Sequence, residues 1–398
     1  MSTSPVATPL PLEGVTVLDL SRVLAGPYAT QMLGDLGADV WKLERPGSGD
    51  ETRGWGPPFI GETSAYFLSV NRNKRSAAID FEDAAQLAAV RNAARAADIV
   101  VENFLPGALV RFGLDAATLR REHPELIVCS ITGYGQDGPW AMLPGYDAVL
   151  QGFVGLQSIT GEADGPPLKV GVAVIDVMTG VHAAAAMLAA YIGRLRHGAG
   201  AHLDLSLVDV GIASLVNVAQ AALSTGKPAR RYGNAHPQIV PYQTFEASDG
   251  ALVVAVGNDE QWQRLCAAIG APELGARIDW TTNAGRVLDR AEVIALIGSR
   301  LRGATCAEWM ARFGAARVPA GPVREVADVV AEPELRRRGL VTEGVSGQGF
   351  NTALFNLPWK SDGSRPPLKF PPPALGQHTA EFMARFGSAG ARAVSCPS

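Results

Sequence analysis

The residues VTVLDLSRVLAGPYATQMLGDLGADVWKL, at positions 15–43, decide the class of fold. Positions 15–20 and 38–43 are short, mostly apolar runs, which is the pattern of buried β-strands. Between them, Gly26 and Pro27 open a helix that ends at Gly37, because proline is favoured in the first helical turn and glycine at the end. A strand, a helix and a second strand in this order predict the beginning of a parallel, Rossmann-like sheet.

The same alternation continues through the first half of the chain. It predicts strands at 76–80, 98–103, 125–132 and 202–207, and helices at 82–96, 177–196 and 208–224. The pattern then changes to a predicted hairpin around 248–250, helices near 259–269, 288–301 and 305–315, and a last helix at about 379–387. Because 398 residues exceed what one core usually supports, we predict an α/β protein with two domains. They are a large Rossmann-like domain, residues 1–225 and 329–398, and a smaller α+β domain, residues 226–328.

Composition narrows the possible functions. The net charge is −4 and the pI about 5.9, so the chain lacks the overall basic character expected for nucleic-acid binding. The histidines show no metal-binding spacing, and no CxxC pair occurs among the four cysteines, which are Cys129, Cys266, Cys306 and Cys396. The start of the chain has no signal-peptide pattern, and the most apolar helical stretch, 181–193, is too short to cross a bilayer. We therefore expect a cytoplasmic protein with no metal, membrane or nucleic-acid partner.

One motif points to a function that its context does not support. Residues 133–138, GYGQDG, match the GxGxxG pattern of dinucleotide-binding proteins and follow a predicted strand. That fingerprint requires a helix immediately afterwards, whose N-terminus faces the pyrophosphate. Here Pro139 and Trp140 follow, and then Pro144 and Gly145. We interpret the segment as a sharply turning loop at the carboxyl end of a strand, and we expect no NAD or FAD.

Several stretches, in order along nearly the whole chain, together resemble one family. They are SRVLAGP (21–27), LGADV (36–40), ERPG (44–47), NRNKRS (71–76), VENF (101–104), GYG (133–135), GYD (145–147), ID (175–176) and LGQHT (375–379). This set is similar to the class III CoA transferases, a family that includes formyl-CoA transferases and α-methylacyl-CoA racemases. The resemblance implies an enzyme that moves CoA from an acyl-CoA thioester to a free carboxylic acid.

The resemblance also implies a fold and a site. The large domain would be built from both chain ends, and two chains would interlock as rings in a homodimer. The nucleophile aligns with Asp176. The CoA contacts align with Val23, Ala25, Arg45, Ile79, Asp80, Asn103, Phe104, Arg111 and Tyr146.

Asp176 suits the proposed chemistry, although a simpler role is open to it. It lies between an apolar stretch and a long predicted helix, where an aspartate often serves as the N-cap. A helix N-terminus stabilises negative charge, which favours an ionised carboxylate that is able to attack a thioester. Covalent catalysis by such a carboxylate divides CoA transfer into easier steps through a mixed anhydride and an aspartyl-CoA thioester.

Cations and an aromatic residue suggest how the phosphates and adenine of CoA are held. Arg72, Lys74 and Arg75 form a run without an acid, and Arg and Lys both bind phosphate. The alternative is a solvated surface run. Phe104 beside Asn103 is placed to stack on and hydrogen-bond an adenine; the alternative is a core phenylalanine at a strand end.

Tyr146 separates two activities of the family. Racemases of this fold have a histidine beside an aspartate at the matching place, where it moves the α-proton. Here Tyr146 precedes Asp147, and a phenol with a pKa of about 10 is a poor proton shuttle near neutral pH. This favours CoA transfer, with an acyl-CoA racemase on the same fold as the alternative.

A loop after residue 229 suggests the substrate class. The segment RYGNAH (231–236) differs from the longer glycine-rich loop of formyl-CoA transferases and is similar to the dicarboxylate branch, which uses succinyl-CoA with glutarate or related acids. In that interpretation Gly233 and Asn234 belong to a loop that covers Asp176 and excludes water. His236, Arg230 or Arg231 would hold the distal carboxylate; the alternative is a plain loop between domains. The donor and the acceptor stay open at this point.

Overall fold

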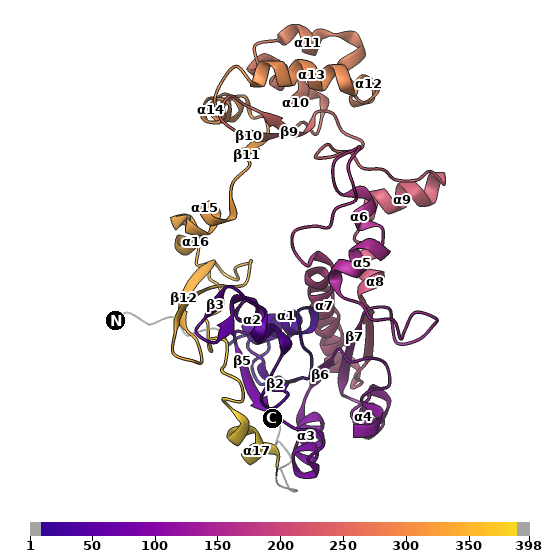
Figure 1. The fold of residues 1–398 in the computed structure, drawn as a ribbon, viewed down its shortest axis with the longest axis vertical. Coiled ribbons are helices and arrows are strands. Elements are labelled where there is room, and N and C mark those ends of the chain that lie inside the picture. Colours follow the sequence, from indigo (N-terminus) through magenta and orange to yellow (C-terminus); the bar gives the residue numbers. More distant parts are fainter. Residues whose placement is uncertain (1–8, 388–398) are drawn as a thin grey trace. The chain divides into compact units, whose positions relative to one another are not determined.

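The computed structural model describes residues 9–387, and Figure 1 shows its ribbon. Cys396 lies outside this range, and so do the first residues of the chain, where no signal peptide was expected. The chain divides into two compact units. Unit 1 comprises the described residues up to Leu156, Val170–Thr225 and those from Pro333 onward, and unit 2 comprises Gln157–Lys169 and Gly226–Glu332. Segment 157–169, which the sequence placed in the large domain, therefore groups with the smaller unit.

Unit 1 is built on a six-stranded parallel sheet, as the sequence predicted. The strand order is β5-β2-β1-β6-β7-β8, so the chain starts in the middle and extends to both edges. The strands are β1 (Thr16–Asp19), β2 (Asp39–Glu44), β5 (Lys74–Ala78), β6 (Ile99–Glu102), β7 (Ile127–Thr132) and β8 (His202–Ser206). All six carboxyl ends consequently meet at one edge, where ligands of open α/β sheets bind.

Helices cover both faces of this sheet because successive strand residues point in opposite directions. On β1, Val17 belongs to the core that includes α1 (Ala25–Asp35) and α7 (Val174–His197), whereas Leu18 belongs to the opposite core. That second core includes α3 (Ala84–Ala96), α4 (Ala116–Glu122) and α17 (Thr379–Phe386). In α17, Phe382 and Phe386 pack on Trp41 of β2, so α17 is part of the core of unit 1 (Figure 1).

Short elements fill the connections of unit 1. They are η1 (Glu51–Gly54), β3 (Phe59–Ile60), β4 (Thr63–Ser64), α2 (Ala65–Val70), η2 (Val110–Phe112), α5 (Asp147–Phe153), α8 (Leu207–Ala213), α9 (Val216–Thr225), α16 (Pro333–Arg337), β12 (Val341–Val345) and β13 (Asn351–Phe355). The helix predicted at 208–224 is two helices, α8 and α9, bent by 79°. The break lies at Val216, whose φ of 42° is incompatible with a continuous helix.

Helix α7 is longer than the apolar stretch that the sequence singled out. It has 24 residues and is, by length and composition alone, able to cross a bilayer; the bent pair α8 and α9 also passes that test. The expectation that this helix is too short was therefore wrong. The partly polar residues before 181 and after 193 are helical as well, so α7 extends beyond the apolar stretch at both ends. Within unit 1 it packs against α1, α8 and β7.

Unit 2 is a small α+β assembly. Strands β9 (Tyr242–Glu246) and β10 (Ala251–Ala255) form the predicted hairpin, and β11 (Ala320–Pro322) adds to β10 antiparallel. The helical elements are α6 (Leu156–Ile159), α10 (Asp259–Ala268), α11 (Pro272–Ala276), η3 (Ile278–Trp280), α12 (Asn283–Leu288), α13 (Arg290–Leu301), α14 (Cys306–Ala316) and α15 (Val326–Ala331), where α6 begins on the last residue of unit 1. A separate core that contains the fully buried Trp262 and Trp280 holds the three strands and the helices from α10 to α14 together.

Candidate active site

Asp176 lies in the first turn of α7, not at its cap. The helix begins at Val174 with Ala173 in the N-cap position, and Ala173 has no side chain that caps the helix. Asp176 is half-buried and lines a cavity of about 260 Å³. The alternative interpretation of Asp176 as an N-cap is therefore wrong, and its carboxylate is available for other chemistry.

The N-terminus of α7 is capped from a distant part of the chain. Asp147, in the first turn of α5 and only 7% exposed, accepts hydrogen bonds at Oδ1 from the backbone N–H of Ile175 (2.8 Å) and Asp176 (3.2 Å). Its Oδ2 accepts from the side-chain amide of Gln151 at 2.6 Å. Gln151 in turn accepts from the backbone N–H of Val170 at 2.8 Å. One carboxylate thus fixes the turn that carries Asp176 and the segment that leads into it.

This environment changes the acidity of Asp176. Burial and then the negative charge of Asp147 raise the pKa of Asp176 to about 7. The sequence predicted that the helix N-terminus would keep this carboxylate ionised. That expectation needs correction, because Asp147 already neutralises the N–H groups on which it relied. Near neutral pH, Asp176 is therefore divided between its protonated and its nucleophilic form.

Three aromatic side chains in contact with one another lie near this acidic pair. The ring of Trp55 meets those of Tyr66 and Tyr146 edge-on, at centroid distances of 5.4 and 6.5 Å. Burial, followed by the negative charges of Asp176 and Asp147, raises the pKa of Tyr66 to about 12. Tyr66 therefore stays a neutral phenol in the field of Asp176. Tyr146 is 62% exposed and lines the same cavity as Asp176.

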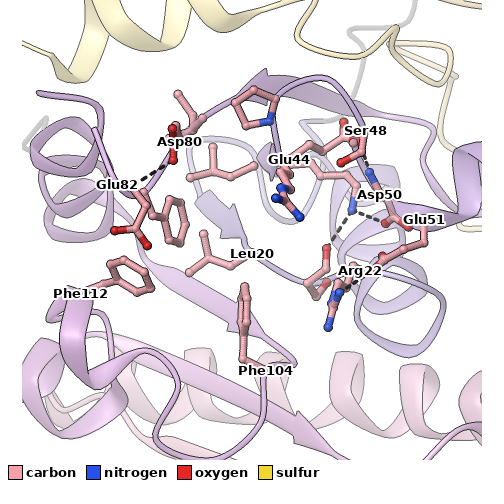
Figure 2. Close-up of a pocket in the computed structure, with 18 of the residues that line it drawn as sticks. Leu20, Arg22, Glu44, Ser48, Asp50, Glu51, Asp80, Glu82, Phe104 and Phe112 are labelled. Atoms are coloured by element: carbon pink, nitrogen blue, oxygen red, sulfur yellow. Dashed lines mark hydrogen bonds and ion pairs between the residues drawn. The ribbon is translucent and has the colours of Figure 1, made fainter. Parts of the chain in front are cut away.

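A larger cavity, cavity A, opens at the carboxyl ends of the strands (Figure 2). Its volume is about 670 Å³, and residues that follow β1, β2, β5 and β6 line it. In Figure 2, Asp80, Glu82 and Phe112 lie on one side and Arg22, Asp50 and Glu51 on the other, with Leu20 and Phe104 between them. Arg45 also lines cavity A and has no ion-pair partner within residues 9–387, whereas Arg111 pairs with Glu82 at 2.9 Å.

The cavity of Asp176, here called cavity B, adjoins cavity A. Both are lined by Arg22 and Phe104, whose guanidinium and ring are 5.9 Å apart. Among the predicted CoA contacts, Arg45, Ile79, Asp80 and Arg111 line cavity A, Val23, Ala25, Asn103 and Tyr146 line cavity B, and Phe104 lines both. A long ligand is therefore able to occupy cavity A with its bulk and reach Asp176 with its end.

Three predicted phosphate ligands do not line either cavity. Lys74 is fully buried in β5 and donates to Asp19 (3.1 Å), the carbonyl of Pro27 (2.7 Å) and Asn71 (3.0 Å). Arg72 donates to both oxygens of Asp35. Both side chains are buried, which the run of cations could not reveal, and both are committed to buried ion pairs.

The third residue, Arg75, is partly exposed but also engaged. It pairs with Asp39 at 3.0 Å and Glu381 at 3.1 Å, and its guanidinium lies 5.4 Å from the centroid of the Trp41 ring. It therefore joins β5 to α17. The geometry gives no support to a phosphate-binding role for residues 72–75, and the interpretation as a solvated surface run is equally wrong for the buried members.

The predicted substrate loop belongs to unit 2. Gly233 has a φ of 61°, and Asn234 accepts a hydrogen bond from the backbone N–H of Thr244 at 3.2 Å. His236 stacks on Tyr242 at 5.3 Å; burial and then the positive charge of Arg290 lower the pKa of His236. Arg231 donates to three backbone carbonyls of segment 157–169, which ties the loop to that segment. The role of these residues toward Asp176 stays a prediction.

Sequence reasoning missed three contributors to this site: Asp147, Gln151 and Tyr66. Asp147 was noted only as the neighbour of Tyr146, since a cap that acts 28 residues away leaves no local pattern. An aspartate at the start of α5 is a recognisable helix signal, but its partners belong to another helix. Tyr66 lies in α2, between the strands predicted at 38–43 and 76–80, where no element was predicted. Within residues 9–387, no cluster of acidic, histidine and cysteine side chains is suited to hold a metal ion.

The fold and the site define a class of protein. A half-buried carboxylate in a cavity that adjoins a larger one, at the carboxyl edge of a parallel sheet, fits an α/β enzyme of covalent group transfer. The chain matches CoA-transferase family III over residues 12–379. It therefore belongs to this family and is an enzyme of the CoA-transferase class.

Known relatives and solved structures are consistent with this assignment. The chain is 42% identical to a succinyl-CoA:glutarate CoA-transferase of Mus musculus, covering 94% of this chain and 86% of that protein. It is also 42% identical to a succinate–glutarate CoA-transferase of Agrobacterium fabrum, covering 94% and 95%. A crystal structure of a CaiB/BaiF family protein from Brucella suis is 41% identical with a TM-score of 0.84, covering 95% of this chain and 100% of that one.

Proposed function

We propose that this enzyme transfers CoA from succinyl-CoA to a second dicarboxylic acid, with Asp176 as the nucleophile. The observation that carries the proposal is the placement of Asp176 in cavity B, beside a cavity large enough for much of a CoA molecule. The names of relatives at 42% identity support succinate and glutarate as the acid pair. A relative from Haloarcula hispanica, 36% identical, is named for succinyl-CoA and mesaconate, so the acceptor within the dicarboxylates is open to test.

The chemistry follows from one carboxylate. Ionised Asp176 attacks the thioester carbonyl of succinyl-CoA, the C–S bond breaks, and a mixed anhydride and a CoA thiolate form. The thiolate attacks the aspartyl carbonyl of the anhydride, which releases succinate and leaves an aspartyl-CoA thioester. The acceptor carboxylate attacks this thioester and releases the thiolate again. The thiolate finally attacks the acceptor's acyl carbon, which yields the new acyl-CoA and regenerates Asp176.

The surroundings of Asp176 suit these steps. Asp147 holds the helical turn in place through two backbone hydrogen bonds, so the nucleophile keeps its position while its carbonyl is attacked. Trp55, Tyr66 and Tyr146 place aromatic rings near the site, and closure over these rings would limit water near a reactive anhydride. We assign Gly233, Asn234 and His236 to closure of the site and to recognition of the acid, as the family resemblance implies.

The binding of CoA is assigned to the two cavities. Arg45 is the cation of cavity A without an ion pair among the described residues, which suits a phosphate. Arg111 is paired with Glu82 but exposed, and such an exposed pair is weak enough to be exchanged for a phosphate. We assign Val23, Ala25 and Tyr146 of cavity B to the pantetheine end, and Ile79, Asp80 and Phe104 to the adenine end.

We further propose a cytoplasmic homodimer. One face of α7 exposes Val181, Ile192 and Leu195, the last with 68% of its surface accessible. Apolar side chains repeated along one helix face are typical of an interface. A second copy of the chain is the partner that the family resemblance implies.

A panel of free dicarboxylic acids tests the proposed activity. Purified enzyme is incubated with succinyl-CoA and each acid, and new CoA esters are measured by mass spectrometry. We expect a new ester with glutarate or a close analogue and none without an acceptor. Exchange of the α-proton of a branched acyl-CoA with solvent deuterium, in the absence of any acceptor, would instead identify a racemase.

A further inference from the structure

Segment 21–24 separates the two cavities and is held by side chains from three places in the fold. Arg22 lines both cavities, and Val23 and Leu24 line cavity B only. A ligand that reaches from cavity A to Asp176 must therefore pass along this segment.

The backbone of the segment is in a costly conformation. Val23 has a φ of 70°, in the left-handed region that a β-branched residue seldom enters. Such a conformation persists only where surrounding contacts impose it, and it often marks a functional position. The contacts that impose it on Val23 should thus be identifiable.

Three buried or half-buried side chains hold successive peptides of this segment. Lys42 donates to the carbonyl of Ser21 at 2.8 Å. The amide of Asn103 accepts from the N–H of Arg22 at 3.0 Å and donates to its carbonyl at 2.8 Å. Both oxygens of Asp50 lie 3.3 Å from the N–H of Val23, which donates to them.

Asp50 is itself firmly fixed. It is 3% exposed, pairs with Lys42 at 2.9 Å, and accepts from the backbone N–H (3.0 Å) and hydroxyl (2.8 Å) of Thr52. Burial favours protonation, but the charge of Lys42 and these hydrogen bonds outweigh it and lower the pKa of Asp50 to about 2. Its carboxylate is therefore a permanent acceptor.

We infer that Asp50 is a positioning residue for CoA transfer: it holds Val23 in its left-handed conformation and so keeps the segment between the cavities in place. Asn103 assists by clamping the Arg22 peptide, which gives its amide a structural use in place of the adenine contact suggested above. This inference rests on the proposed CoA transfer and deepens it. Nothing in it requires Asp50 to touch the reacting atoms.

The test is a rescue experiment. Asp50→Asn should lower kcat/KM for the acyl-CoA roughly 10- to 100-fold, the loss that a misplacement of about 1 Å produces. Glycine adopts a positive φ without strain, whereas alanine keeps the Cβ that causes it. Adding Val23→Gly to Asp50→Asn should therefore recover about five- to tenfold of the loss. The matched control Val23→Ala removes the β-branch but keeps Cβ, so it should recover much less than Val23→Gly.

Thr52→Val is the second background, because it keeps the Lys42–Asp50 ion pair and removes only one hydrogen bond to Asp50. It serves if Asp50→Asn fails to fold. We expect a smaller loss of kcat/KM, which Val23→Gly again relieves more than Val23→Ala does. Equal effects of glycine and alanine, with a wild-type enzyme that transfers CoA, would overturn the positioning role alone. A wild-type enzyme that transfers CoA to no dicarboxylate would overturn the proposed function and this inference with it.

Discussion

At the scale of residues, two carboxylates with different surroundings form the centre of the site. Asp147 is buried and satisfied by the N–H groups of α7 and by Gln151, whereas Asp176, next to it, has the raised pKa. Two neighbouring acids whose environments differ in this way take different roles. Asp147 organises the helix start, and Asp176 changes its protonation state near neutral pH.

The raised pKa of Asp176 predicts how transfer depends on pH. Only the ionised carboxylate attacks, and its pKa is about 7. The rate of the acylation step should therefore rise with pH and level off above about pH 8, with a loss approaching tenfold per pH unit well below the pKa. Single-turnover rates with succinyl-CoA between about pH 5.5 and pH 8.5 measure this. A rate that is flat down to about pH 5 would contradict a raised pKa.

The same shift predicts an effect on stability. The pKa of Asp176 in the folded protein, about 7, is above the ordinary value of 3.8, so its protonated form is favoured by folding. The contribution of Asp176 to the free energy of unfolding is present at low pH and is lost as the pH rises through about 7. The side chain in Asp176→Asn stays neutral at every pH. The Tm of this variant should therefore increase relative to that of the wild type between about pH 5 and pH 8. Parallel Tm curves in differential scanning calorimetry would contradict this.

At the scale of elements, the sequence predicted the strands and helices of unit 1 well, because their hydrophobic periodicity is a local property. It failed where a partner is distant. The run at 72–75 has the composition of a phosphate site, but β5 is covered on both faces, and Lys74 meets Asp19 of β1. Periodicity also predicted one helix at 208–224 where there are two, because no local sequence signal indicates that Val216 adopts a left-handed conformation.

Two cations at the edges of these strands should behave in opposite ways. Lys74→Met leaves Asp19 without one of its buried partners, and breaking such a pair costs about 3–5 kcal/mol of unfolding free energy.

Arg45→Ala removes an exposed cation that has no ion-pair partner within residues 9–387, so stability should change by less than about 0.5 kcal/mol. Its KM for acyl-CoA should rise roughly tenfold or more, the loss of one charged hydrogen bond.

Denaturant unfolding and steady-state kinetics on the same two variants separate these effects. Arg121 is an exposed cation of α4 that lines neither cavity, so Arg121→Ala is a control that should not raise KM. If Lys74→Met instead unfolded like the wild type and bound CoA poorly, the phosphate role suggested by the sequence would be restored.

At the scale of the whole molecule, the site joins segments that are far apart in the chain. Cavity A is made by the ends of four strands, and cavity B by Asp176 of α7, Tyr146 at the start of α5 and the segment after β1. The family resemblance could name these residues, but only the folded chain shows that Arg22 and Phe104 connect the two cavities. The most important positioning contacts, from Asp147 and Asp50, join residues between 27 and 29 positions apart.

During each turnover, the proposed mechanism requires Asp176 to carry an acyl group and then CoA. The most direct measurement is to incubate the enzyme with succinyl-CoA, treat it with borohydride or hydroxylamine, and analyse its peptides by mass spectrometry. We predict a modification at Asp176 that is absent from Asp176→Ala, which should be folded and inactive. An unmodified Asp176, together with full turnover by Asp176→Ala, would contradict the account.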